Sequence, residues 1–67
     1  MTRTNIRELR KAKGMTLASL SEKVGVSIAY LSDIEKGNRH GSPYTISRIA
    51  DALGVALSDI AEITEVG

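Results

Sequence analysis

Two stretches with helical periodicity, residues 16–24 and 27–36, are separated only by the turn Gly25-Val26-Ser27. A linker this short leaves too little room for antiparallel side-chain packing, so the two helices should cross at a steep angle. Gly25 supplies the left-handed backbone conformation that such a turn needs. The spacing therefore predicts a helix-turn-helix over about residues 16–36.

Glycines and small polar residues divide the rest of the chain into further stretches with apolar residues at helix spacing. The first expected helix begins between Thr2 and Asn5 and stops before Gly14. The other four run from Thr16 to Gly25, from Ser27 to Gly37, from Ser42-Pro43 to Gly54 and from about Leu57 to Ile63. The last is short and lacks a good capping residue. Strand alternation and hairpin signals are absent, so we predict a compact all-α fold of five helices.

The length of 67 residues predicts one domain, residues 1–67. The chain has 0 Cys, which excludes disulfides and thiolate metal sites, and its aromatic residues are 2 Tyr, so the core must be aliphatic. No apolar run approaches the length of a membrane span, and the amino terminus has no signal-peptide core. We therefore expect a cytoplasmic protein without a membrane partner.

Charge is distributed unevenly along the chain. Residues 1–13 carry five basic side chains against Glu8 alone, whereas residues 51–67 carry four acids and no base. The first end suits a polyanion and the second repels one. On charge alone, a first helix that merely exposes a solvated basic face is the favoured interpretation.

The segment TLASLSEKVGVSIAYLSDIEKG, preceded by GMT and followed by RIADALGV, resembles the Cro/repressor-type, lambda-repressor-like helix-turn-helix family. The resemblance extends from about Asn5 to Ile60 and includes the spacing, the glycines and the apolar anchors together. It implies a five-helix domain that binds double-stranded DNA, commonly as a homodimer on a palindromic operator. The implied function is transcriptional regulation, with repression favoured.

A helical wheel of residues 27–36 centred on Leu31 places Glu35 beside the buried face. A buried carboxylate without a partner is too costly to tolerate, so Glu35 needs a cation. Arg10, at the end of the first helix, is the candidate, and the family pattern has an Arg–Glu pair at the matching positions. The alternative is that Glu35 reaches solvent near the helix end.

Base-edge recognition in the major groove requires suitable side chains near the start of the recognition helix. Ile28 and Ala29 offer apolar contact of the kind that suits a thymine methyl group. Tyr30 and Ser32 supply hydroxyls, and the carboxylate of Asp33 can accept from a cytosine amino group while it repels phosphate. Direct readout from this set is limited, so DNA shape is expected to contribute to specificity.

Phosphate contacts are expected from the loop after that helix and from the helix starts. Leu17 stands where many family members carry a Gln that binds a phosphate, so Thr16 and the adjacent N–H groups must replace that contact. The candidate phosphate-binding residues are Thr16, Ser27, Lys36, Asn38, Arg39 and His40.

The carboxy-terminal segment, residues 55–67, is the candidate dimer interface. It holds more apolar side chains than a short terminal segment can bury against a small core, and such a surplus is typical of an interface. The candidates are Leu57, Ile60, Ile63 and Val66. The alternative is that Leu57 and Ile60 pack inside the monomer.

No other chemistry is indicated by the sequence. His40 is the only histidine, no glycine-rich phosphate loop is present, and no carboxylate cluster has metal-ligand spacing, so we expect no enzyme, cofactor or metal site. No separate domain for a small-molecule effector is expected either. The main alternative function is a repressor-like module that binds protein, as an antirepressor or adaptor.

Overall fold

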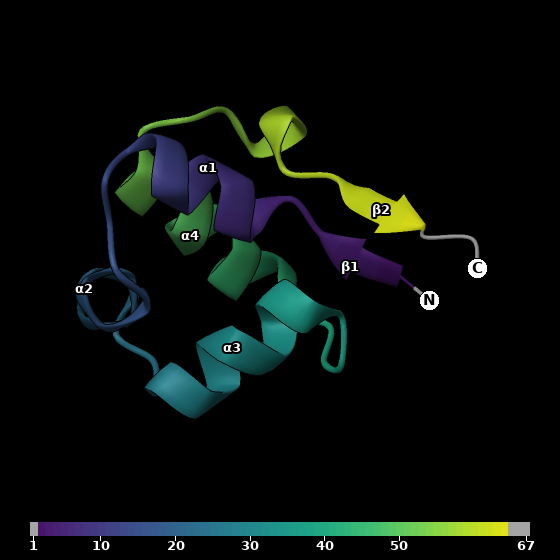
Figure 1. Ribbon diagram of the computed structural model, residues 1–67, viewed down its shortest axis with the longest axis horizontal. Coiled ribbons are helices and arrows are strands. Elements are labelled where there is room, and N and C mark those ends of the chain that lie inside the picture. The colour runs from purple at the N-terminus through teal and green to yellow at the C-terminus, as the bar shows by residue number, and fades with distance from the viewer. Residues whose placement is uncertain (1, 65–67) are drawn as a thin grey trace.

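The computed structural model describes residues 2–64, which form four α-helices, one 3-10 turn and a pair of short strands (Figure 1). The elements are β1 (Thr2–Thr4), α1 (Ile6–Ala12), α2 (Leu17–Val24), α3 (Ile28–Lys36), α4 (Pro43–Leu53), η1 (Leu57–Asp59) and β2 (Glu62–Thr64). The strand pair lies at one end of the molecule and α2 at the other (Figure 1).

Side-chain caps fix the starts of three helices where the sequence predicts them. The hydroxyl of Thr16 accepts from the backbone N–H of Ser19 at 3.0 Å and begins α2. Ser27 and Ser42 cap α3 and α4 in the same way. Gly25 then ends α2 with φ 83°, which a residue with a Cβ rarely adopts, and turns the chain into α3.

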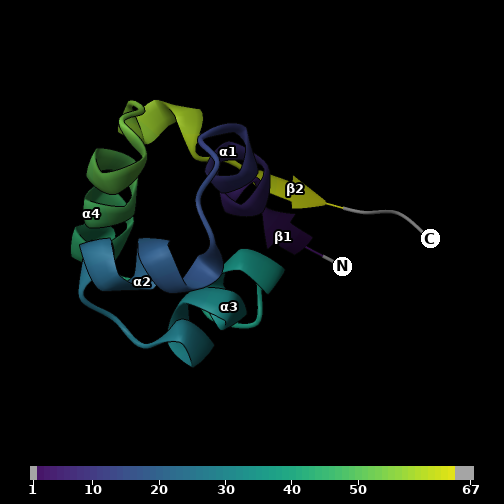
Figure 2. The same ribbon diagram turned by 60° about the vertical axis from the view of Figure 1, so that its left-hand side comes forward.

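The helices pack around one aliphatic core, with α2 lying between α3 and α4 (Figure 2). Ser21 is buried on α2, and its hydroxyl donates to the carbonyl of Ala18 at 2.8 Å, so the small side chain is satisfied within its own helix. The buried core residues are Ile6, Leu20, Val24, Leu31, Ile34, Ile49 and Leu53. This core brings α2 and α3 together as a helix-turn-helix.

The prediction of a fifth helix, from about Leu57 to Ile63, is wrong. Only Leu57–Asp59 forms a 3-10 turn, and the chain then extends into β2, which pairs antiparallel with β1 so that Arg3 lies opposite Ile63. Asn5 extends the connection, because its backbone N–H donates to the carbonyl of Ala61 at 3.0 Å and its side-chain oxygen accepts from the Ala61 N–H at 2.8 Å. The fold is therefore mostly helical, with a small sheet that joins the two ends of the described chain.

Arg10 and Glu35 form a buried ion pair between α1 and α3. Arg10 Nε lies 2.8 Å from Glu35 Oε2 and Nη2 lies 3.3 Å from Oε1, while Nη1 donates to the carbonyl of Met15 at 2.9 Å. The two residues are only 9% and 7% exposed. A two-point contact of this kind is stronger and more directional than a single one.

We expect Arg10→Met to lower the free energy of unfolding by about 3–5 kcal/mol, because it leaves the Glu35 carboxylate buried without a cation. Urea unfolding followed by circular dichroism measures the change. The double change Arg10→Met with Glu35→Leu should recover much of the loss, since it removes both charges. A single Arg10→Met protein as stable as the parent would show that the pair is dispensable.

Candidate nucleic-acid interface

The outer face of α3 carries the five predicted base-reading residues. Ile28 is 50% exposed and Ala29 is also exposed, at the amino-terminal end of the helix. Tyr30, Ser32 and Asp33 are half-buried on the following turns. The structure thus brings all five onto the first two turns of one helix, with part of each side chain open to solvent.

Arg39, from the loop between α3 and α4, folds back onto this face. Its Nε lies 3.3 Å from Asp33 Oδ2, and its guanidinium carbon lies 5.7 Å from the centre of the Tyr30 ring. Both contacts are solvent-exposed and are individually weak. Together they place a cation beside the only carboxylate among the five residues, so that the charge of Asp33 is offset within the face itself.

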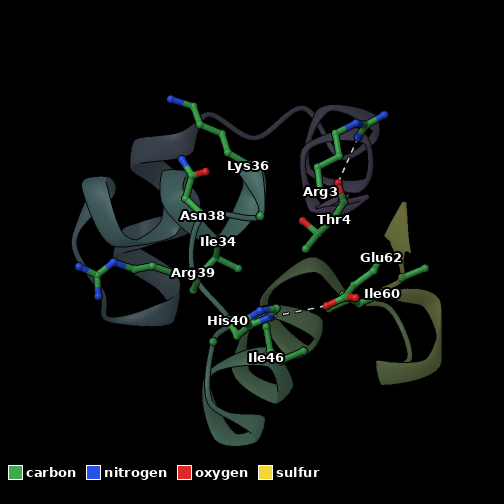
Figure 3. A pocket seen from close by; sticks show the side chains of 13 residues that line it. Arg3, Thr4, Ile34, Lys36, Asn38, Arg39, His40, Ile46, Ile60 and Glu62 are labelled. Atoms are coloured by element: carbon green, nitrogen blue, oxygen red, sulfur yellow. Dashed lines mark hydrogen bonds and ion pairs between the residues drawn. The ribbon is translucent and has the colours of Figure 1, made fainter. Parts of the chain in front are cut away.

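The same loop is held to the end of α3 by its backbone. The N–H groups of Asn38 and Arg39 both donate to the carbonyl of Asp33, at 2.9 and 3.3 Å. Gly37, with φ 80°, allows this reversal of the chain. Lys36, Asn38 and Arg39 are exposed, and Figure 3 shows their side chains directed away from the core. The backbone of the loop that is predicted to bind phosphate is thereby fixed, while its side chains reach outward.

His40 connects this loop to the strand pair. Its Nδ1 lies 3.7 Å from Glu62 Oε1 in β2, a contact that becomes an ion pair when the imidazole is protonated (Figure 3). The two side chains are 87% and 63% exposed, so the contact is weak. It nevertheless shows that His40 faces the strand pair as well as solvent.

The start of α2 has a reciprocal cap. Thr16 Oγ1 accepts from the Ser19 N–H, and Ser19 Oγ in turn accepts from the Thr16 N–H at 3.1 Å. The hydroxyl hydrogen of Thr16 remains available for donation, whereas its backbone N–H is engaged within the helix start. Ser27, at the start of α3, is exposed and caps the Tyr30 N–H.

Two arginines near the amino terminus extend this surface beyond the predicted residues. Arg3 and Arg7 line a hollow of about 570 Å³ together with Leu17, Ser32 and Lys36, between α1, α2 and α3. The sequence predicts a basic amino-terminal segment but does not select these two, because the approach of Arg7 to α3 depends on how α1 packs and that of Arg3 depends on the pairing of β1 with β2. We call this site the basic hollow.

Glu8 moderates the charge of that segment. Arg3 Nη1 lies 2.6 Å from Glu8 Oε1. A hydrogen bond from the backbone N–H of Glu8 and, after it, the side chain of Arg3 lower the pKa of the Glu8 carboxyl. Glu8 is therefore ionised at neutral pH and offsets one positive charge at the edge of the basic hollow.

The predicted dimer residues do not share a helix face, because the helix that would align them is absent. Leu57 is 54% exposed in η1, whereas Ile60 packs partly against the core and Ile63 is half-buried in β2. Val66 lies outside the described residues. The surplus of apolar surface is thus smaller than the sequence suggests, and among the described candidates it is centred on Leu57.

Residues 2–64 contain neither a cluster of metal ligands nor a helix that could span a membrane. No group of three His, Asp or Glu side chains in that range is arranged to hold a metal ion. Over the same range, the helices are too short and too polar for any of them to cross a bilayer.

Comparison with known proteins associates this geometry with a family. A model of the helix-turn-helix family matches residues 6–60. The chain is 33% identical over 60 residues to the HTH-type transcriptional regulator DdrOP3 of Deinococcus deserti, covering 90% of this chain but only 46% of that protein. It is 38% identical over 56 residues to the uncharacterized HTH-type transcriptional regulator YazB of Bacillus subtilis, covering 84% of this chain and 81% of YazB.

A solved structure agrees with these relatives. The crystal structure of SinR, a master regulator for biofilm formation, in complex with DNA superposes with a TM-score of 0.75 at 34% sequence identity. The match covers 81% of this chain and 87% of that one. The similarity therefore includes both the fold and the sequence of nearly the whole described domain.

Proposed function

This chain belongs to the helix-turn-helix family of transcriptional regulators, and we propose that it binds a palindromic DNA operator in the cytoplasm and represses transcription there. In this proposal α3 enters the major groove. The observation that carries it is the outer face of α3, with hydroxyl and apolar side chains, next to a loop whose exposed cations project from an anchored backbone. SinR, the relative solved with DNA, has the same fold.

Base reading is assigned to Ile28, Ala29, Tyr30, Ser32 and Asp33. The first two make apolar contact with thymine methyl groups, and the hydroxyls of Tyr30 and Ser32 bond base edges. Asp33, offset by Arg39, selects for a cytosine amino group and against bases that present only acceptors. Because few of these contacts are bidentate, the deformability of the operator supplies further specificity.

Phosphate binding is assigned to the loop side chains of Lys36, Asn38, Arg39 and His40, and to the helix starts at Thr16 and Ser27. Phosphate contacts fix the position of a protein on DNA but carry no base information. Arg39 has two roles here, since it also contacts Tyr30 and Asp33.

A second copy of the chain completes the proposed DNA-binding unit. One recognition helix reads too few base pairs for useful specificity, and two-fold dimers place their recognition helices about 34 Å apart, one turn of DNA. Leu57 is the best-supported contact, because it is large, apolar and 54% exposed. Ile60 and Ile63 border it along the chain, and Val66 would extend the interface.

One observation favours the alternative of a protein-binding module. Ile28 exposes half of its surface at the position nearest the tip of α3, where an apolar side chain suits a protein groove at least as well as a base edge. Salt dependence separates the two functions, because only phosphate binding releases a large number of counterions.

We expect log K for a selected operator duplex to fall linearly with log of the salt concentration. Lys36→Gln should reduce the slope by about 0.9, the loss of one phosphate contact, and weaken all sequences alike. Lys23→Gln, at an exposed cation near the far end of α2, is the matched control and should leave the slope unchanged. A flat salt series for the parent protein would favour the protein-binding alternative.

Tyr30→Phe and Ser32→Ala should instead change the preference at one or two base pairs, at a cost of about 1–3 kcal/mol each. Tyr30→Phe keeps the aromatic ring under Arg39 and removes only the hydroxyl. Binding to a randomised duplex pool, sequenced before and after selection, measures the preference. Uniform weakening at every position would remove these two hydroxyls from the base-reading set.

Leu57→Asp should convert a dimer into a monomer and make the two half-sites bind independently, because it places a charge in the apolar contact. Ser58→Asp adds the same charge at the next exposed position and serves as the control. Sedimentation with and without operator duplex measures both effects. A Leu57→Asp protein that still dimerises would move the interface elsewhere.

A further inference from the structure

A second hollow, which shares Arg3 and Lys36 with the basic hollow, lies where the strand pair meets the loop between α3 and α4. We call it the loop hollow. Its volume is about 490 Å³, and its walls come from β1, the end of α3, the loop, α4 and the chain leading into β2 (Figure 3). That volume is within the range of sites for small organic ligands.

The floor of the loop hollow is apolar. Ile46 from α4 and Ile60 from the carboxy-terminal segment are partly exposed there, and Ile34 of α3 lies beneath them. Gly41 brings the loop backbone close to this floor, because a Cβ at that position would lie 3.0 Å from Ile46 Cδ1 and 3.2 Å from Ile34 Cδ1. The floor therefore suits the apolar body of a ligand and gives a phosphate group no contact.

The rim of the loop hollow is basic. Lys36, Arg39 and His40 come from α3 and the loop, Arg3 comes from β1, and Glu62 is the acid among the lining residues. Arg39 already contacts Asp33, whereas Lys36 forms no ion pair within residues 2–64. A ligand with a negative charge at the rim would complement this imbalance, and a cation would add to it.

From this floor and rim we infer that the loop hollow binds a small organic acid, with its hydrocarbon part on Ile46 and Ile60 and its carboxylate at His40, while the outward-directed Lys36 adds electrostatic attraction from the rim. The acid replaces the weak His40–Glu62 contact with a charge-assisted one when the imidazole is protonated. The site is formed within the DNA-binding domain itself and needs no separate effector domain.

Regulation follows from the shared residues, and this step rests on the proposed function. Lys36 and His40 are also assigned to phosphate, so an acid bound in the loop hollow competes with DNA for the same cations. Linkage requires the effect to be mutual, since operator DNA must weaken acid binding by the same factor. The acid would therefore act as an inducer that releases the regulator from its operator.

Sodium octanoate is a suitable probe, with octylammonium chloride as the control of equal chain length and opposite charge. Titration of the full chain labelled with ¹⁵N should give saturable shifts of the backbone amides at residues 37–41 and 60–62, in the millimolar range expected for so small a ligand. Octylammonium should give no saturable shift there. Equal binding of the two probes would overturn the assignment of an acid.

Two variants test the location. Lys36→Gln should weaken octanoate binding about two- to fivefold, the range for one exposed charge pair, and Lys23→Gln should not. Ala61→Asp adds a carboxylate beside the hollow and should weaken binding similarly, whereas Ser47→Asp adds the same charge on the exposed face of α4. Octanoate binding that none of these changes affects would overturn the site.

The DNA measurement distinguishes this inference from the proposed function. Octanoate should raise the apparent Kd for the operator more than sodium chloride does at equal sodium concentration, and Ala61→Asp should remove the difference. Without shifts at 37–41 and 60–62, the loop hollow is refuted even if DNA binds. Shifts that persist in a protein with no DNA binding refute the proposed function alone. If instead the resonances of the same amides shift with protein concentration, and octanoate does not reverse that shift, a second copy of the chain occupies the loop hollow and the inference is wrong.

Discussion

The guanidinium of Arg10 is the point on which the arrangement of the helices depends. It bonds Glu35 at 2.8 and 3.3 Å and the carbonyl of Met15 at 2.9 Å, and so joins α1, the segment before α2 and the last turn of α3. Thr4 adds a longer contact of 3.4 Å from its hydroxyl to the carbonyl of Glu35. Because the pair is buried, each member needs the other, and α3 cannot shift along α1 without exposing a charge to the core. The ion pair on the inner side of α3 therefore fixes the orientation of its outer face.

The sequence predicts those parts of the fold whose causes are local. Thr16, Ser27 and Ser42 cap their helices because the cap is a contact between residues three apart. The failure at the carboxy terminus has the opposite cause. Leu57, Ile60 and Ile63 have helix spacing, but β2 forms by pairing with a strand about 60 residues earlier, and three residues are too few to show strand alternation.

The features of the candidate site also divide into those with local causes, which the sequence predicts, and those that depend on the fold, which it does not. A wheel of residues 27–36 turns Ala29, Ser32, Asp33 and Lys36 outward because one helix sets their direction. Ala29 and Lys36 are exposed, whereas Ser32 and Asp33 are half-buried. The contacts of Arg39 with Tyr30 and Asp33 could not be predicted, since they depend on the path of the loop after Gly37. The approach of Arg3 to Lys36 likewise depends on the strand pair, which the sequence did not reveal.

The strand pair changes what a small helix-turn-helix domain can do with its loop. Here β2 and Ile60 close one side of the loop after α3 and form the loop hollow. The cations proposed to bind phosphate therefore have an apolar surface beside them. In the proposed function and the inferred acid site, affinity for DNA and affinity for the acid depend on the same side chains, Lys36 and His40, so a substitution at either position should change both affinities. Substitution at Ala61, which borders the hollow but lies outside the proposed phosphate-binding set, separates the two.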